Sequence, residues 1–210
     1  MSKRSNFDKV PKEFYRSIDP KIGQALAPYV RGLTYASPCY GEGDLEDQLM
    51  DVATCKWRSD IRETVGCSEV MPVSSIKEEY LEGVDCIIEN PPFSKDALLP
   101  ILDHLLPMGK PMWLLLPWDH LQNGYMKPYV KYMQCAVPLG RLYWFENEWI
   151  CFHDVDNDNG LEGYGFYMGW WDHSKNKPAK SKFTRGTDNY CWLLFDDRGT
   201  EGDKTVRITY

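Results

Sequence analysis

Apolar runs separated by short polar segments divide the first 120 residues into alternating strand and helix candidates. The strand candidates lie at 33–37, 54–61, 84–90 and 110–117, and the last two are mostly apolar. The helix candidates carry apolar residues three or four positions apart and lie at 20–30, 45–53 and 95–106. Nearly continuous apolar strands are typical of a parallel sheet that is covered on both faces. The alternation predicts a doubly wound α/β fold, with a mostly parallel central sheet and helices on both faces.

The rest of the chain has a different pattern, because its strand candidates are rich in aromatic residues and have no helices between them. They lie at 140–146, 148–154, 164–171 and 189–196. We expect these C-terminal strands to complete the sheet in antiparallel orientation. A length of 210 residues suits one α/β domain. The predicted domain spans 1–210, with an N-terminal segment at 1–32 and a basic loop at 172–188.

The composition is that of a globular protein, since 43% hydrophobic and 14% aromatic residues supply enough apolar material for a packed core. No apolar run approaches the roughly 18 residues that a membrane helix needs. The first ten residues are charged and have no apolar stretch behind them, so we expect no signal peptide. We therefore expect a soluble protein in the cytoplasm, which is the host-cell cytoplasm if the protein is viral, and no membrane partner.

The cysteines and acidic residues do not predict a metal site. The seven cysteines include no C-x-x-C pair, so we expect reduced thiols instead of a disulfide framework or a zinc site. The acidic stretch that begins at Asp154 resembles a calcium loop, but its twelfth position is Gly165, where a glutamate is required. We expect a solvated turn there and no metal in the protein.

Two turns that follow predicted strands carry candidate chemistry. In "SPCYGEGD" (37–44), Gly41 and Gly43 would allow the backbone to approach a ligand closely, although a plain tight turn is the alternative. In "NPPF" (90–93), the side-chain oxygen of Asn90 and the carbonyl of Pro91 could accept both hydrogens of an amine. Phe93 could stack on the ring that carries this amine. The alternative is a structural turn before a helix, but ligands of open α/β sheets do bind beyond the carboxyl ends of the strands.

Together, "SPCYGEGDL" and "ENPPFS" resemble the motifs of class I S-adenosylmethionine-dependent N6-adenine methyltransferases. That family has a D/E-P-x-x-G-x-G turn after its first strand and D/N/S-P-P-Y/F/W after its fourth. Four further segments resemble the small phage-type orphan members of the family, and the resemblance covers roughly residues 13–171. These segments are "EFYRSIDPKIGQALAPYV", "WRSDI", "LLLPWDHLQNGYMKPYV" and "YGFYMGWWD". The resemblance implies a Rossmann-like class I methyltransferase fold with S-adenosylmethionine as cofactor.

The resemblance also implies roles for individual residues in methyl transfer to the exocyclic N6 amine of adenine. Asn90 and Pro91 would accept the hydrogens of the amine, and Phe93 would stack on the extruded base. Asp60 would receive the ribose hydroxyls of the cofactor, and Tyr15 would close the cofactor site from the N-terminal segment. The predicted catalytic corner is Asn90, Pro91, Pro92 and Phe93. The predicted cofactor-binding residues are Tyr15, Ser37, Pro38, Cys39, Gly41, Gly43, Asp44, Asp60, Ile61 and Asn90.

One position departs from the family pattern. The acid that begins the glycine turn, which helps to hold the methionine amino group, is Ser37 in this chain. Asp44 and Glu42 are the candidate replacements. The departure keeps a second interpretation open, in which a catalytically weak methyltransferase fold serves as a binding or assembly subunit.

The order of the segments and the charge of the chain bear on which nucleic acid is the substrate. The phage-like layout favours DNA, with RNA adenine as the alternative substrate. A net charge of −7 opposes a broad nucleic-acid surface, but the basic loop carries a local excess of cations. We predict that these cations hold phosphates beside the catalytic face, although a solvated hairpin tip is the alternative. They are Lys175, Lys177, Lys180, Lys182 and Arg185. Since no block of about 80 residues remains for a recognition module, a homo-oligomer or a specificity partner is compatible with the sequence.

Overall fold

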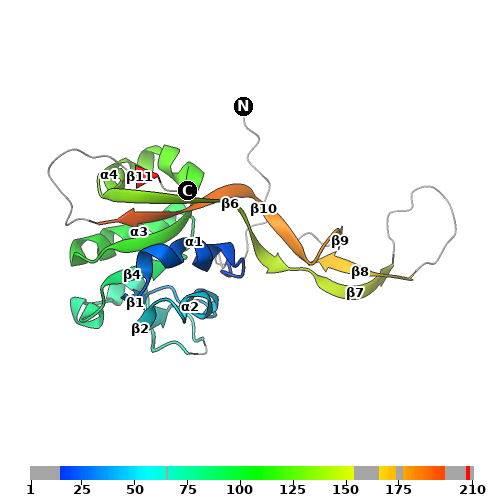
Figure 1. Ribbon diagram of the computed structural model, residues 1–210, viewed down its shortest axis with the longest axis horizontal. Coiled ribbons are helices and arrows are strands. Elements are labelled where there is room, and N and C mark those ends of the chain that lie inside the picture. Colours follow the sequence, from blue (N-terminus) through cyan, green and yellow to red (C-terminus); the bar gives the residue numbers. More distant parts are fainter. Residues whose placement is uncertain (1–14, 65, 154–165, 174–176, 197–206, 209–210) are drawn as a thin grey trace.

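The computed structural model describes residues 15–64, 66–153, 166–173, 177–196 and 207–208. These residues form a body built around an eight-stranded sheet and a projecting arm that contains a three-stranded sheet (Figure 1). Residues 15–64 and 66–146 form most of the body, and two long strands, β6 (Met133–Glu146) and β10 (Phe183–Phe195), connect it to the arm.

The central sheet has the order β11-β6-β10-β5-β4-β1-β2-β3. Its parallel part consists of β1 (Thr34–Ser37), β2 (Thr54–Asp60), β3 (Glu69–Val70), β4 (Cys86–Glu89) and β5 (Met112–Pro117). Next to β5 lies β10 (Phe183–Phe195), antiparallel to it, followed by β6 (Met133–Glu146) and β11 (Arg207–Ile208). The predicted fold class, a Rossmann-like, mostly parallel sheet with antiparallel C-terminal strands, is confirmed.

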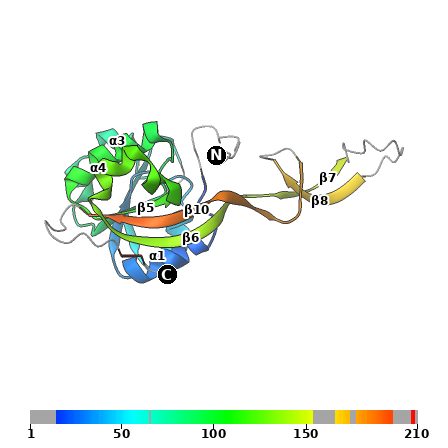
Figure 2. The same cartoon turned by 90° about the horizontal axis from the view of Figure 1, so that it is seen from above.

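Helices cover both faces of this sheet (Figure 2). One face carries α1 (Lys21–Val30) and α2 (Asp44–Leu49), and the other carries α3 (Lys95–Leu105) and α4 (Lys127–Val130). Short 3-10 helices complete the connections; they are η2 (Val73–Ser75), η3 (Glu78–Leu81), η4 (Leu106–Met108), η5 (Trp118–Gln122) and η6 (Gly124–Met126).

The two layers explain why the central strands are apolar throughout. In β5, Leu114 and Leu116 belong to the buried cluster that includes residues of α3. The alternate residues Trp113 and Leu115 belong to the cluster that includes residues of α1. Because successive side chains of a strand point to opposite faces, a strand covered by helices on both sides has to be apolar at every position.

The predicted boundaries hold best in the parallel part of the sheet. The four strands expected there are β1, β2, β4 and β5, and the helix expected at 45–53 ends earlier, at Leu49. The antiparallel strands are longer than predicted, because β6 begins at Met133 and β10 at Phe183. Pro138 lies within β6, so a proline that suggests a break is accommodated there with a register shift between β6 and β10.

The prediction that all four aromatic strands complete the central sheet is wrong for two of them. β7 (Glu148–His153) and β8 (Phe166–Asp172) pair with each other and with β9 (Lys177–Ala179) in a separate sheet, the arm. Asn147 marks the base of the arm. Its backbone N–H donates to the carbonyl of Lys182 at 2.6 Å, and its side-chain amide donates to the carbonyl of Ser181 at 2.7 Å. These bonds hold the chain at the point where β6 ends and the second sheet begins.

Several sequence-based expectations concern metals, membranes and thiols. Within the described ranges, no helix is long and apolar enough to cross a membrane, and no group of three or more His, Cys, Asp or Glu residues could hold a metal ion. The seven cysteines are free thiols; Cys86 and Cys191 are buried, whereas Cys151 on the arm is exposed. The calcium-like stretch at 154–165 lies outside the described residues.

Candidate active site

A cavity of about 310 Å³ lies at the carboxyl ends of β1, β2 and β4. The strand order reverses between β1 and β4, which is where ligands of open α/β sheets bind. The wall is formed by segments that the sequence analysis singled out, joined by the start of α3 and by residues 71–74. The segments from the sequence analysis are 15–17, 37–42, 60–62 and 89–90, together with Pro92.

The glycine turn after β1 adopts a backbone that its sequence requires. Gly41 and Gly43 have φ values of 63° and 85°, in the left-handed region that favours glycine. A Cβ atom on Gly43 would lie 2.5 Å from the hydroxyl oxygen of Tyr40, so a side chain there would also clash. The turn brings the backbone of Gly41 into the cavity wall.

Asp60, at the end of β2, fixes this turn. Its Oδ2 accepts a hydrogen bond from the backbone N–H of Gly41 at 2.9 Å, and its Oδ1 accepts one from the backbone N–H of Arg62 at 2.9 Å. Asp60 is 6% exposed and lines the cavity. A carboxylate oxygen can accept more than one hydrogen bond, so these contacts leave acceptor capacity toward the cavity.

The two polar atoms of the Asn90 side chain differ in their hydrogen bonding. Nδ2 donates to the backbone carbonyl of Tyr15 at 2.7 Å and to Oγ of Ser17 at 3.0 Å. Because a carbonyl only accepts, the contact with Tyr15 fixes which end of the amide is the nitrogen. Oδ1 is buried and has no hydrogen-bond partner among the described residues. Asn90 therefore presents an unsatisfied acceptor at the end of β4.

Residues 15–19, the N-terminal strap, cross the cavity and are held from several elements. Besides the contacts with Asn90, the backbone carbonyl of Ser17 accepts a hydrogen bond from the side chain of Gln48 in α2. Arg16 forms an ion pair with Asp44, which raises the pKa of the guanidinium. Asp19 accepts a hydrogen bond from the backbone N–H of Tyr143 at 3.3 Å. The first three residues of the strap line the cavity, and closure of the cofactor by Tyr15 stays a prediction.

Phe93 does not line the cavity and belongs to an aromatic cluster beside it. The Tyr15 ring stacks on Phe93 with centroids 4.9 Å apart and an interplanar angle of 26°. Trp144 of β6 and Tyr190 of β10 approach the same ring at 5.8 and 5.5 Å. The sequence analysis gave neither residue a role at the site. Their position depends on the pairing of β10 with β5 and β6, which joins residues far apart in the chain.

Glu89 is the residue of the cavity wall that sequence reasoning missed. It is 1% exposed, and its Oε1 accepts a hydrogen bond from the backbone N–H of Cys39 at 2.8 Å. Burial raises the pKa of this carboxyl to about 8, although the Cys39 amide and the Ser37 hydroxyl favour the charged form and lower it. The available signal was a carboxylate at the end of an otherwise apolar strand.

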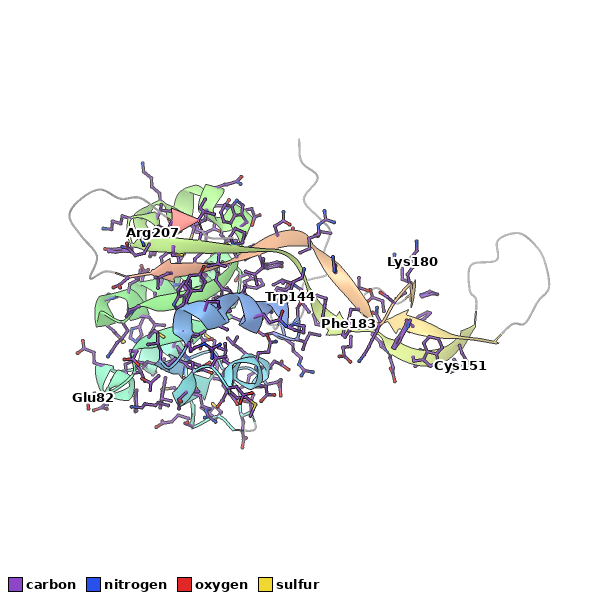
Figure 3. The ribbon with its side chains drawn as sticks, in the orientation of Figure 1. Glu82, Trp144, Cys151, Lys180, Phe183 and Arg207 are labelled. Carbon is purple, nitrogen blue, oxygen red and sulfur yellow. The ribbon has the colours of Figure 1, made fainter. Side chains whose placement is uncertain are left out.

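The structure brings most predicted site residues together and leaves a few apart. Those that line the cavity are Tyr15, Ser37, Pro38, Cys39, Gly41, Asp44, Asp60, Ile61, Asn90 and Pro92. Gly43, Pro91 and Phe93 adjoin the cavity along the chain without lining it. The basic residues lie elsewhere. Lys180 is on the arm, beyond the end of the central sheet, whereas the basic loop was predicted beside the catalytic face (Figure 3). Lys175 lies outside the described residues.

Comparisons with known proteins add little beyond the arrangement of elements. No protein-family model and no curated protein matches the sequence. A protein from Listeria monocytogenes described as a class I S-adenosylmethionine-dependent methyltransferase has a TM-score of 0.47 and 9% identity, and the match covers 90% of this chain and 62% of that one. One from Pyrococcus horikoshii described as an RNA methyltransferase has a TM-score of 0.47 and 13% identity, with 92% and 91% covered. A protein from Vibrio vulnificus described as a modification subunit of a type I restriction enzyme has a TM-score of 0.46 and 12% identity, and the match covers 92% of this chain and 49% of that one.

The chain therefore spans less than two thirds of the first and the third of these proteins. Identities and TM-scores at this level carry no argument about activity, which has to be inferred from the residues of the cavity.

Proposed function

We propose that the protein transfers a methyl group from S-adenosylmethionine to the exocyclic N6 amine of adenine in DNA. The observation that carries this proposal is the unsatisfied Oδ1 of Asn90 at the end of β4, in the wall of a cavity at the switch point of the sheet. The hydrogen bonds of Nδ2 to Tyr15 and Ser17 fix the orientation of the amide. Its oxygen is therefore suited to accept a hydrogen bond from a planar amine.

The residues present fit S-adenosylmethionine. Asp60, at the end of β2, is placed to receive ribose hydroxyls, as acids do in dinucleotide-binding folds. The backbone around Gly41 offers close approach, and the N-terminal strap covers the ligand. When bound, the cofactor supplies an electrophilic methyl group on a positively charged sulfur.

The residues of the N-P-P-F corner act on the acceptor. The lone pair of an aromatic amine is delocalised into its ring, so the amine is a poor nucleophile. Hydrogen bonds from the amine to Asn90 Oδ1 and to the Pro91 carbonyl favour a pyramidal nitrogen whose lone pair points at the methyl group. With S-adenosylmethionine bound, the lone pair would form the N–C bond as the C–S bond broke, and the surplus proton would pass from the nitrogen to water. Orientation provides most of the rate enhancement in such a site.

Access to this corner involves the N-terminal strap. Asn90 Oδ1 is buried, and the Tyr15 ring already stacks on Phe93. A base that stacks on Phe93 takes the place of the Tyr15 ring. The strap thus has two roles in the proposal. It covers the cofactor, and its Tyr15 side chain moves off Phe93 when the extruded base enters.

DNA is proposed over RNA because the chain resembles small phage-type DNA adenine methyltransferases. RNA adenine is the second candidate, since both nucleic acids present the same amine. A catalytically weak binding subunit is the third, favoured by Ser37 in place of the usual acid. The experiment that separates them is incubation with methyl-labelled S-adenosylmethionine and either DNA or RNA, followed by digestion and mass spectrometry. The proposal predicts N6-methyladenine from DNA; label in RNA alone supports the second candidate, and no transfer to either supports the third.

The arm is the proposed contact for the nucleic-acid backbone. It carries Lys177 and Lys180 as exposed cations, with Lys182, which pairs with Glu146, at its base and Arg185 nearby in β10. Trp149 is 53% exposed, and its ring meets that of Trp170 edge to face with centroids 5.1 Å apart. Exposed aromatic rings beside cations suit single-stranded or extruded bases and their phosphates. Lysines position such a strand without reading its sequence.

Replacing Lys177, Lys180 and Lys182 by Gln should weaken DNA binding equally for every sequence tested, as measured by fluorescence anisotropy. The slope of log affinity against log salt should fall by about 0.7–0.9 for each phosphate that the arm no longer neutralises. Lys21, Lys127 and Lys131, exposed on the body, give a control triple variant with the same change in net charge. An equal loss of affinity in both triple variants, or no loss in the arm variant, would mean that the arm lysines are ordinary solvated surface residues without a specific role in DNA binding.

A further inference from the structure

Glu89 is a buried carboxylate in the cavity wall that the proposed transfer step does not use. It ends β4, directly before Asn90, and is 1% exposed. Oε1 accepts a hydrogen bond from the backbone N–H of Cys39, whereas Oε2 makes no hydrogen bond of normal geometry among the described residues; the Ser37 hydroxyl and the Asn90 backbone N–H are near enough to favour the charged form but do not complete its coordination. A buried carboxylate oxygen without a donor is costly. Because Glu89 lines the cavity, a ligand bound there could supply the missing donor.

The position of Glu89 relates it to the acid that is missing from β1. β1 and β4 are parallel neighbours, and Ser37, the last residue of β1, lies close enough for its hydroxyl to lower the pKa of Glu89. Two other acids of the cavity were candidate replacements for the missing one. Asp44 is occupied by its ion pair with Arg16, and Glu42 is exposed. Of the three acids, Glu89 combines burial with an unsatisfied oxygen.

We propose that Glu89 binds the α-ammonium group of the amino-acid part of S-adenosylmethionine through Oε2, in place of the acid that Ser37 does not supply. The inference rests on the proposed function, because it names the group that holds one end of the cofactor. An ammonium group supplies three donors and a positive charge, which satisfy the free oxygen and stabilise the ionised carboxylate. The amide of Cys39 holds the other oxygen, so the carboxylate is oriented before the ligand arrives.

A consequence is that ligand binding releases a proton. With a pKa of about 8, Glu89 is mostly protonated at neutral pH in the free protein, and pairing with an ammonium group requires the charged form. The titratable groups that act on Glu89 or are acted on by it are Asp60, Cys39, Tyr35 and Cys55. Burial raises the pKa of the two thiols and of the tyrosine above the neutral range. Affinity for an ammonium-bearing ligand should therefore rise with pH up to about 8.

Calorimetry with two ligands tests the inference. S-adenosylhomocysteine carries the ammonium group, whereas 5′-methylthioadenosine lacks the whole amino-acid part. Glu89→Gln keeps an oxygen for the Cys39 amide but removes the charge. We expect this variant to bind S-adenosylhomocysteine about 10- to 150-fold more weakly, the range for a lost hydrogen bond to a charged group. Its affinity for 5′-methylthioadenosine should stay within about threefold.

Proton release gives a second readout. Binding of S-adenosylhomocysteine to the wild-type protein at neutral pH should show heats that depend on the ionisation enthalpy of the buffer, and this dependence should vanish in Glu89→Gln. Glu82→Gln, which removes an exposed carboxylate that does not line the cavity, is the matched control and should behave as wild type, whereas Glu42→Gln tests the other exposed candidate acid of the wall. Thermal unfolding of each variant shows that the compared proteins are folded.

Three results would overturn the inference. One is an equal loss of affinity for both ligands in Glu89→Gln, which would mean that Glu89 only maintains the shape of the turn. Another is unchanged S-adenosylhomocysteine affinity in that variant, and the third is a loss in Glu42→Gln instead. Failure of the wild-type protein to bind either ligand is a different outcome, which contradicts the proposed function itself and the inference with it.

Discussion

Asn90→Ala should reduce methyl transfer by about 10²–10³-fold, the cost of removing one preorganised polar group from a transition state. The amide oxygen that accepts the amine hydrogen is lost, while the groups proposed to hold the cofactor, Asp60 and Glu89, are unchanged. Affinity for S-adenosylhomocysteine should therefore fall little. Initial rates with labelled S-adenosylmethionine and DNA, alongside calorimetry, measure the two effects separately.

The control for this prediction is Ser17→Ala. Asn90 also holds the N-terminal strap through Nδ2, and Ser17 Oγ is one of the two acceptors of that nitrogen. Ser17→Ala weakens the strap but keeps Oδ1, so its turnover should stay far above that of Asn90→Ala. Near-normal turnover in Asn90→Ala, or an equal loss in both variants, would mean that the corner is only a structural turn.

Asp60→Ala should weaken S-adenosylhomocysteine binding by roughly 1.5–3 kcal/mol, which is about 10- to 150-fold. The variant removes the proposed acceptor for the ribose hydroxyls and releases the backbone of Gly41 from its 2.9 Å hydrogen bond. Calorimetry at a fixed pH measures the change.

A matched control for Asp60 lies at the opposite end of the sheet. Asp85 accepts a hydrogen bond from the backbone N–H of Thr34 at 2.8 Å, at the beginning of β1, and does not line the cavity. Asp85→Ala removes a carboxylate that also holds backbone, yet it should leave the affinity unchanged. If Asp60→Ala bound the ligand as tightly as wild type, the assignment of the ribose to the end of β2 would be wrong.

The parallel half of the fold could be predicted because its information is local. Strands such as β4 and β5 are apolar at nearly every position, a pattern that follows directly from burial on both faces. The glycine turn and the N-P-P-F corner each lie at a strand end, so the topology alone brings them to one edge. Most of the cavity wall could therefore be predicted from short motifs.

The arm could not be predicted in this way. β7 and β8 are rich in aromatic residues, which suggested burial in the central sheet, yet Trp149 and Met168 are 53% and 59% exposed. Which sheet a strand joins depends on pairing over long separations, and at the base of the arm the side chain of Asn147 bonds Ser181 and Thr184, which are 34 and 37 positions away. A run of residues does not encode that choice.

Two features of the site depend on the same kind of long-range contact. The role of Glu89 emerges only when β1 and β4 lie side by side, because its partner is the backbone of Cys39, 50 positions away. The environment of Phe93 depends on Tyr15 and on strands from the C-terminal half. The motif placed Asn90 at the end of β4, and its role as an acceptor stays a prediction; the motif did not predict that the Tyr15 ring stacks on Phe93.

Calorimetric titration of the wild-type protein with S-adenosylhomocysteine tests the central claim, that the cavity at the ends of β1, β2 and β4 is an S-adenosylmethionine site. We predict saturable binding with one ligand per chain, weakened in Asp60→Ala and unchanged in Asp85→Ala. Absence of saturable binding by the folded wild-type protein at ligand concentrations up to about 1 mM, where even an affinity of about −4 kcal/mol is detectable, would contradict the claim.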